Sequence, residues 1–179
     1  MSIELTLSIV SAVVAVLSLI GSILIYNVTR YRENYQNLMD RISLYFSPEM
    51  LSAIQHIWGF YREHGDQEFL NKYIVVMLAE NKIMESLSPS ERLDFQLNSL
   101  HYQRRLVTHF WRGVAILIEN NLVPRKAVFN WWAKDDIEIV DKILIPLENK
   151  VAEYYQVSIY DPETEPLYYL SSIKHKFSR

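Results

Sequence analysis

The chain has 179 residues, of which 50% are hydrophobic, 22% charged and 13% aromatic, with four glycines, six prolines and no cysteine. This composition excludes disordered, collagen-like and disulfide-stapled proteins, and the absence of thiols excludes cysteine nucleophiles and cysteine-ligated zinc. The formal charge of −3 argues against coating of nucleic acid by overall charge, so only a local basic patch could serve that purpose.

An uncharged apolar segment runs from Leu5 to Tyr26 and is 22 residues long. At about 1.5 Å per residue it can cross a hydrocarbon layer of about 30 Å, which predicts a transmembrane helix. A cleaved signal peptide is the alternative, but Glu4 stands where a basic region should precede the apolar run. Because Arg30 and Arg32 follow the span, we expect the N-terminus outside and the rest of the chain in the cytoplasm.

Small residues recur in this span at spacings of three and four, which places them on one stripe of the helix. Such a stripe is typical of helices that pack closely or that face water in a pore. A lone anchor, whose serines bond to carbonyls one turn back, is the alternative. The predicted pore-lining or packing residues are Ser8, Ser11, Ala15, Ser18 and Ser22.

We divide the chain into a transmembrane helix over residues 1–28 and a cytoplasmic helical domain over residues 29–179. Prolines, capping residues and one glycine mark where the helices of this domain begin and end. In chain order, we expect a helix over 27–46 that continues from the span, one from Pro48 to Gly65, one over 67–86, a long one over 89–121, a short one through 129–132, and one from Asp135 that Pro146 kinks or divides. Residues 158–166 resemble a loop, and 167–177 a short helix or a strand. The fold class is therefore all-α.

The long helix over 89–121 has an apolar stripe that should be buried against neighbouring helices. One position of this stripe is occupied by Arg104 instead of an apolar residue. An arginine in an apolar seam needs a partner, because a buried charge is costly when it is left unpaired. The apolar members are Leu93, Leu97, Leu100, Val107, Trp111, Val114 and Ile118.

Arg104 and His109 form an R-x4-H pattern at the start of a strongly basic region. Residues 100–134 carry a net charge of +5, and residues 135–166 carry −7, so opposite charges are segregated along the chain. The candidate catalytic residues are Arg104 and His109. The candidate basic interface consists of Arg104, Arg105, His109, Arg112, Arg125 and Lys126.

Three interpretations of this basic region remain open. A histidine can move a proton at an RNA 2′-hydroxyl while an arginine stabilises the phosphorane, as metal-independent RNA cleavage requires. The region could instead bind RNA or a nucleotide, with Trp131 and Trp132 as stacking rings, although we expect one of these two rings to pack in the core. In the third interpretation, Arg104 pairs with a carboxylate between helices, and the other face meets the acidic region of the same or a neighbouring subunit.

The Leu5–Tyr26 span, the Arg30 and Arg32 flank and the Arg104-x4-His109 pattern together resemble the small accessory membrane protein of type VI-B CRISPR systems. That family has one N-terminal span and a divergent HEPN domain, and the resemblance covers essentially the whole chain. It also extends to a broader group of bacterial one-span helical proteins of unknown function. Active HEPN ribonucleases usually have Asn, Asp or His after the motif arginine, whereas this chain has Arg105.

The resemblance implies a bacterial inner-membrane protein that acts in antiviral defence beside an RNA-guided RNase, as a homo-oligomeric ring that permeabilises or depolarises the membrane. From the residues, we expect cytoplasmic domains to associate head to tail through the +5 and −7 regions, with the spans around a serine-lined axis. We expect no metal, no cofactor and no enzymatic activity. A membrane-tethered ribonuclease and a non-catalytic scaffold for another protein remain as alternatives.

Overall fold

A computed structural model describes residues 3–132, 134–157 and 165–174, and its account of side chains begins at Ser11. Every element in these ranges is helical, which confirms the predicted all-α class. The elements are α1 (Ile3–Tyr45), α2 (Pro48–Ser86), α3 (Pro89–Asn98), α4 (Leu100–Glu119), α5 (Arg125–Trp131), α6 (Lys134–Ile139), the π-helical turn η1 (Val140–Leu144), α7 (Ile145–Tyr154) and α8 (Pro166–Lys174).

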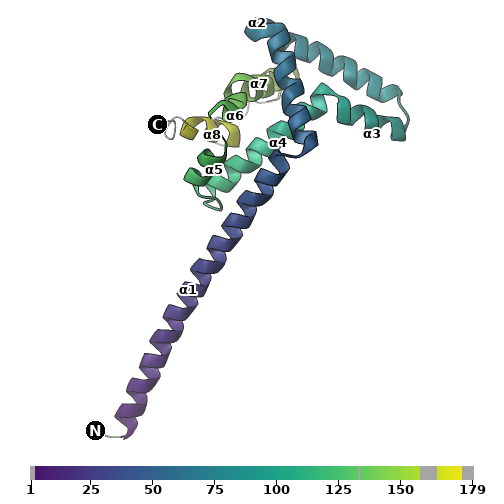
Figure 1. Cartoon of the computed structure of the whole chain (residues 1–179). Coiled ribbons are helices and arrows are strands. Elements are labelled where there is room, and N and C mark those ends of the chain that lie inside the picture. Colours follow the sequence, from purple (N-terminus) through teal and green to yellow (C-terminus); the bar gives the residue numbers. More distant parts are fainter. Residues whose placement is uncertain (1–2, 133, 158–164, 175–179) are drawn as a thin grey trace.

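Helix α1 is one long rod that extends away from the other helices (Figure 1). Among the described residues, it is the one helix that is long and apolar enough to cross a membrane, with a mean hydropathy of 2.1 over its most apolar stretch. Nearly all of its side chains from Ser11 to Glu33 are exposed, whereas Leu38, Ile42 and Tyr45 near its end are buried. The helix therefore continues without a break past residue 28, and its last turns belong to the core of the domain.

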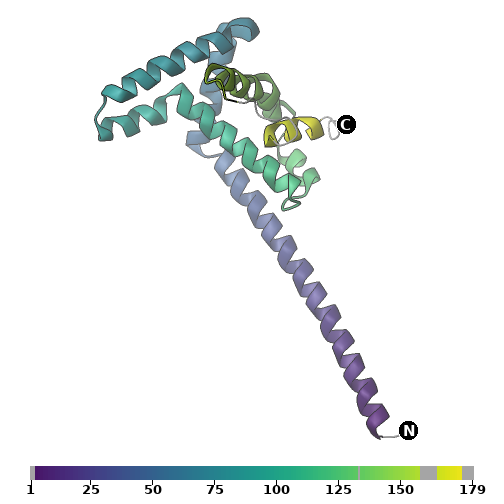
Figure 2. The same ribbon diagram turned by 180° about the vertical axis from the view of Figure 1, so that it is seen from behind.

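The domain is built around α4, which packs against α2, α8, η1 and the end of α1. The two views from opposite sides show α4 in the middle of the domain, at the far end of the α1 rod (Figures 1 and 2). Four aromatic side chains join α1, α4 and the end of α5, with ring centres 5.2–6.0 Å apart. These are Tyr45, Phe110, Trp111 and Trp132, all of them buried.

The predicted long helix over 89–121 is wrong, because the chain breaks at Ser99 between α3 and α4. Ser99 has an extended backbone (φ −74°, ψ 141°), and its hydroxyl accepts a hydrogen bond from the N–H of Tyr102. The Glu80 carboxylate from α2 accepts from the next two N–H groups, those of Leu100 at 2.7 Å and His101 at 3.0 Å. The new helix start is stable here because a distant side chain satisfies the N–H groups that an interrupted helix leaves free.

The predicted apolar stripe is confirmed in α4 and wrong in α3. Leu100, Val107, Trp111, Val114 and Ile118 are buried. Leu93 and Leu97 are 61% and 42% exposed. The break at Ser99 ends the regular helical spacing, so their positions in α3 no longer lie on the buried face of α4.

Gly65 interrupts α2, as predicted, with a backbone conformation (φ 65°, ψ 174°) that the rest of the helix does not share. Beyond this kink, the second half of α2 and α3 run side by side as an arm that projects from the domain (Figures 1 and 2). The arm exposes apolar side chains on both of its helices, namely Val75, Leu78, Ile83, Leu93 and Leu97.

We expect Gly65→Ala to lower the free energy of unfolding by about 1–3 kcal/mol, because this region of φ and ψ is essentially restricted to glycine. Gly59→Ala is the matched control in the helical first half of α2, where an added Cβ meets no atom within 4 Å. It should raise the stability by about 0.5–1 kcal/mol. Thermal unfolding of the detergent-solubilised chain, followed by circular dichroism, measures both effects, and a common sign for the two variants would contradict the assignment of strain to Gly65.

The remaining helix predictions agree with the structure in type. Ser47 caps α2 ahead of Pro48, a capping box opens α3, and the short predicted helix corresponds to α5. Residues 166–174 form a helix rather than a strand. Most of the loop predicted over 158–166 lies outside the described residues.

Candidate functional site: a basic pocket beside a buried ion-pair network

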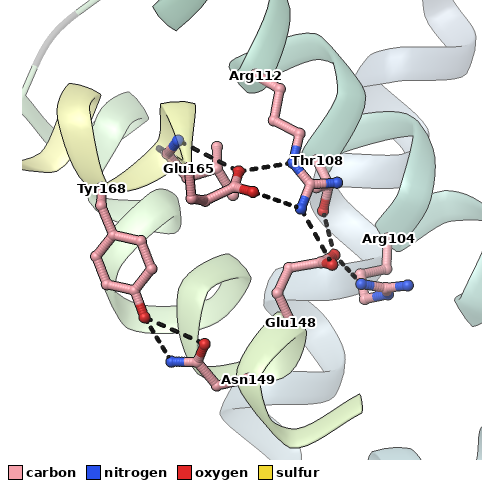
Figure 3. A network of polar contacts seen from close by, with 8 residues as sticks. Arg104, Thr108, Arg112, Glu148, Asn149, Glu165 and Tyr168 are labelled. Carbon is pink, nitrogen blue, oxygen red and sulfur yellow. Dashed lines mark hydrogen bonds and ion pairs between the residues drawn. The ribbon is translucent and has the colours of Figure 1, made fainter. Parts of the chain in front are cut away.

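Arg104 is 4% exposed and forms an ion pair with Glu148 of α7 in the interior of the domain. Thr108, one turn further along α4, donates its hydroxyl proton to the same carboxylate at 3.2 Å. Figure 3 shows the two α4 side chains converging on Glu148. The structure therefore contains the ion pair between helices that was one of the three interpretations of Arg104.

Arg112 extends this network to the segment that leads into α8 (Figure 3). Its Nε donates to Glu165 Oε1 at 2.7 Å, and its Nη2 lies 3.4 Å from Glu148 Oε2. Both carboxylates belong to the acidic region of the same chain, so opposite charges meet within one subunit. The network ties α4 to α7 and α8 through charged groups that are mostly shielded from water.

The π-helical turn η1 sets the position of Glu148 on α7. Pro146 has no N–H to donate to the carbonyl one turn back, so a regular helix cannot pass through it unchanged. The N–H of Ile145 instead donates to the carbonyl of Val140, five residues earlier. This extra residue in the turn changes the phase of α7 relative to α6, and Glu148 comes to face α4.

A pocket of about 280 Å³ lies beside this network, between α4 and α7, and we call it the basic pocket. Both residues of the R-x4-H pattern line it, so the fold brings Arg104 and His109 to one cavity although they are five positions apart on the helix. Arg104 lies at its buried side, whereas Arg105 and His109 are exposed. The lining residues are His101, Arg104, Arg105, Thr108, His109, Arg112, Glu148 and Val151.

Burial and the neighbouring arginines favour the uncharged form of both histidines of the basic pocket. Burial, together with Arg104 and Arg105, lowers the pKa of His101 to about 4. Burial and the neighbouring arginines also lower the pKa of His109. An uncharged His109 can accept a proton, although a lowered pKa weakens it as a base. The arginines and the lining carboxylate leave the pocket with an excess of positive charge, which favours an anionic ligand.

Two members of the candidate basic interface lie elsewhere. Arg125 and Lys126 are exposed at the start of α5, and the Arg125 guanidinium lies 5.8 Å from the centre of the Tyr169 ring. The neighbouring tryptophans differ as expected: Trp132 is 1% exposed in the aromatic core, and Trp131 is 50% exposed.

Within the described part of the chain, several carboxylates of the acidic region form ion pairs. Apart from the network around Arg104 and Arg112, Glu138 pairs with Lys142, Glu153 with Lys150, and Asp141 with Lys174. Asp136 accepts a hydrogen bond from the hydroxyl of Tyr45 at 2.9 Å. Ion pairs with Arg104, Arg112 and Lys174 therefore neutralise part of this acidic charge within one chain. The docking of a +5 region onto a −7 region of another subunit stays a prediction.

The serine stripe of α1 lies in its exposed part. Ser11, Ala15, Ser18 and Ser22 have no burial within the chain, and the side chain of Ser8 lies outside the described residues. The Ser22 hydroxyl donates to the Ser18 carbonyl at 2.8 Å, the bond to the preceding turn that was considered for a lone anchor.

Sequence reasoning identified Arg104, His109 and Arg112 but not their partners. Glu148, Glu165 and Thr108 complete the network, and no short motif marks them. Tyr73, whose hydroxyl lies 3.0 Å from His101 Nδ1, was also missed because it comes from another helix. Within the described residues, no group of His, Asp and Glu side chains is arranged to hold a metal ion.

Fold and site together define an all-helical protein with one helix able to span a membrane and a basic pocket beside a buried ion-pair network. Comparisons of the chain with protein-family models, with curated proteins and with solved structures find no match.

Proposed function

We propose that this chain is a single-span membrane protein whose copies gather with their serine stripes toward a common axis and permeabilise the bilayer. In this proposal, the N-terminus lies outside the bacterial inner membrane and the helical domain lies in the cytoplasm. The resemblance to the accessory membrane proteins of type VI-B CRISPR systems adds the setting, an antiviral defence in which membrane damage reinforces an RNA-guided RNase.

The observation that carries the proposal is the relation between two faces of α1. Leu38, Ile42 and Tyr45 mark the face that packs onto the domain. At about 100° of rotation per residue, the stripe formed by Ser11, Ala15, Ser18 and Ser22 lies about 180° away from this face around the helix axis. Each domain would then lie on the outer side of its own span, so copies could bring their stripes together without a clash between domains.

The exposure of α1 supports the same assembly. From Ser11 to Glu33 its side chains pack on no other part of the described chain, so lipid or another copy must cover them. Lipid covers the leucine, isoleucine and valine faces well, but hydroxyl groups gain little from acyl chains. The hydroxyl of Ser22 bonds to a carbonyl and still has oxygen lone pairs that can accept a hydrogen bond from water.

This proposal differs from the sequence-based mechanism in what holds the copies together. Because Arg104 and Arg112 of the basic region pair with Glu148 and Glu165 of the same chain, we assign the association to the spans and not to opposite charges on the domains. Packing of small residues brings helices close in a bilayer without any hydrophobic drive.

We expect the triple variant Ser11→Leu/Ala15→Leu/Ser18→Leu to abolish ion flux from liposomes that contain the full chain. Three leucine side chains would fill the space in which water and ions pass and would replace hydroxyls by apolar surface. Flux is measured as the release of a trapped dye or the collapse of an imposed K⁺ gradient.

The matched control places the same number of leucines on other faces of the span, as Val13→Leu/Val16→Leu/Ile20→Leu, and should leave the flux unchanged. The mass of each protein in detergent shows whether the copies still associate. Unchanged flux in the stripe variant would refute the pore lining. A monomeric wild type without flux would refute the whole proposal and favour the anchored scaffold.

A second candidate function, metal-independent RNA cleavage, is favoured by one observation: Arg104 and His109 line the same pocket. If this function is correct, purified chain cuts RNA without metal and His109→Ala abolishes the cleavage without changing the oligomer. His64→Ala, on α2 and away from the pocket, is the control. A wild type that cuts no RNA eliminates this candidate.

A further inference from the structure

A second cavity adjoins the basic pocket, and the two share His101 and Arg105 in their walls. This cavity has a volume of about 140 Å³ and lies where the arm of α2 and α3 meets the start of α4. We call it the arm pocket. The arm pocket is the smaller of the two and contributes aromatic and amide side chains, whereas the basic pocket contributes arginines.

The arm pocket has the side chains that recognise a planar heterocycle. Phe95 and Tyr102 supply aromatic rings, and Asn81 and Gln96 supply amide groups that can both donate and accept hydrogen bonds. Aromatic stacking and amide contacts to base edges are the usual means of holding a nucleobase. Glu80 also lines the pocket, but its carboxylate is already committed to the N–H groups of Leu100 and His101.

Two hydrogen bonds hold Tyr102 in the wall of this pocket. Its hydroxyl donates to Glu49 Oε1 at 3.2 Å, and its N–H donates to the Ser99 hydroxyl at 3.1 Å. A ring whose hydroxyl and backbone are already hydrogen-bonded loses less conformational freedom when a ligand binds, which favours affinity.

Arg105 belongs to the wall that the two pockets share. Arg105 is exposed and forms no ion pair within the described ranges of the chain. The Arg104 guanidinium, in the wall of the basic pocket, is paired with Glu148 and adds to the positive charge around Arg105. An anionic group beside Arg105 would form charge-assisted hydrogen bonds, which are stronger than neutral ones.

His101 lines both pockets, so its side chain can contact a ligand in either one. Its Nδ1 lies 3.0 Å from the Tyr73 hydroxyl, so Nε2 is the ring nitrogen left for a ligand. Burial and, after it, the positive charges of Arg104 and Arg105 lower the pKa of His101, and the negative charge of a phosphate would offset the effect of these two charges.

We propose that the adjoining arm and basic pockets bind a nucleoside phosphate, with the base between Phe95 and Tyr102 and the phosphate against Arg105. The shared ligand chemistry is a nucleobase linked to a phosphate ester, whether as a free nucleotide or at the end of a nucleic acid strand. This inference does not depend on the proposed pore, since binding is measured on the protein without any readout of flux.

Isothermal titration of the full chain in detergent with AMP, UMP, adenosine and inorganic phosphate tests the proposal. We expect at least one of the two nucleotides to bind tenfold more tightly than adenosine and than phosphate alone. Arg105→Gln should weaken nucleotide binding at least tenfold and leave adenosine binding unchanged. Phe95→Leu should weaken nucleotide and adenosine binding at least fivefold, in line with the usual contribution of one stacked base.

Lys126→Gln is the matched control, because it removes an exposed positive charge from α5, outside both pockets, and should leave binding unchanged. Circular dichroism confirms that each variant is folded. Nucleotide binding no tighter than that of inorganic phosphate, or unaltered by Arg105→Gln, would overturn the proposal. A short oligoadenylate with a terminal phosphate separates the two sources: tighter binding than AMP identifies a strand end, and weaker binding identifies a free nucleotide.

Discussion

Glu148→Ala should lower the free energy of unfolding of the helical domain by about 3–5 kcal/mol, because it leaves one charge buried without its partner. Arg104 is almost fully enclosed and would lose the carboxylate that neutralises it. Arg112 would lose one of its two carboxylate partners but would keep Glu165. The loss is measured as the shift in chemical or thermal unfolding of the full chain in detergent.

Two companion variants make this prediction specific. Glu153→Ala breaks an exposed ion pair with Lys150 and should cost no more than about 1 kcal/mol. The double change Arg104→Met/Glu148→Leu replaces both buried charges by apolar groups, and should recover most of the loss because neither charge is left alone. If Glu148→Ala and Glu153→Ala cost the same, the network around Arg104 does not carry the stability that its geometry implies.

Trp132→Ala should cost about 3–5 kcal/mol, because it opens a cavity in the aromatic cluster that joins α1, α4 and α5. The ring of Trp132 lies 5.7 Å from those of Tyr45 and Trp111 and is shielded from water. The adjacent Trp131 is half exposed, and Trp131→Ala should cost less than about 1 kcal/mol.

Both variants replace one tryptophan by alanine, at adjacent positions. A difference between their free energies of unfolding therefore reports the difference in burial of the two rings. Unfolding followed by far-ultraviolet circular dichroism avoids the loss of a fluorescent ring as a complication. If Trp131→Ala were the more costly change, the assignment of Trp132 to the core would be wrong.

The sequence predicted the local features of the fold, because caps, prolines and glycines act on neighbouring residues. Ser47 ahead of Pro48, the capping box at Ser88 and the break at Gly65 are all of this kind. The break at Ser99 was missed because its cause is remote: Glu80 lies 20 residues away from the N–H group of Leu100 that it binds. A continuous apolar stripe through 89–121 therefore looked like one helix.

The candidate site was predictable to the same extent. An arginine in an apolar seam must find a carboxylate, so the pairing of Arg104 between helices followed from physical chemistry alone. The identity of its partner did not follow, because it depends on the helical phase at Glu148 after the π-helical turn. Likewise, Phe95, Tyr102 and Arg105 share a pocket wall only because α3 folds back on α2.

Helix α1 continues without a kink or loop from its exposed apolar stretch to the turns that are buried in the domain. Leu38 and Ile42 are buried there, and the Arg41 guanidinium lies so close to α4 that a Cβ on Gly113 would approach it to 3.0 Å. Spans answer a change in bilayer thickness by tilting. Over the roughly 40 Å of helix from mid-span to the domain, a tilt of about 10° displaces the far end by about 7 Å. In the proposed membrane assembly, the thickness of the surrounding lipid would thereby set the position of each domain above the bilayer and its distance from the neighbouring copies.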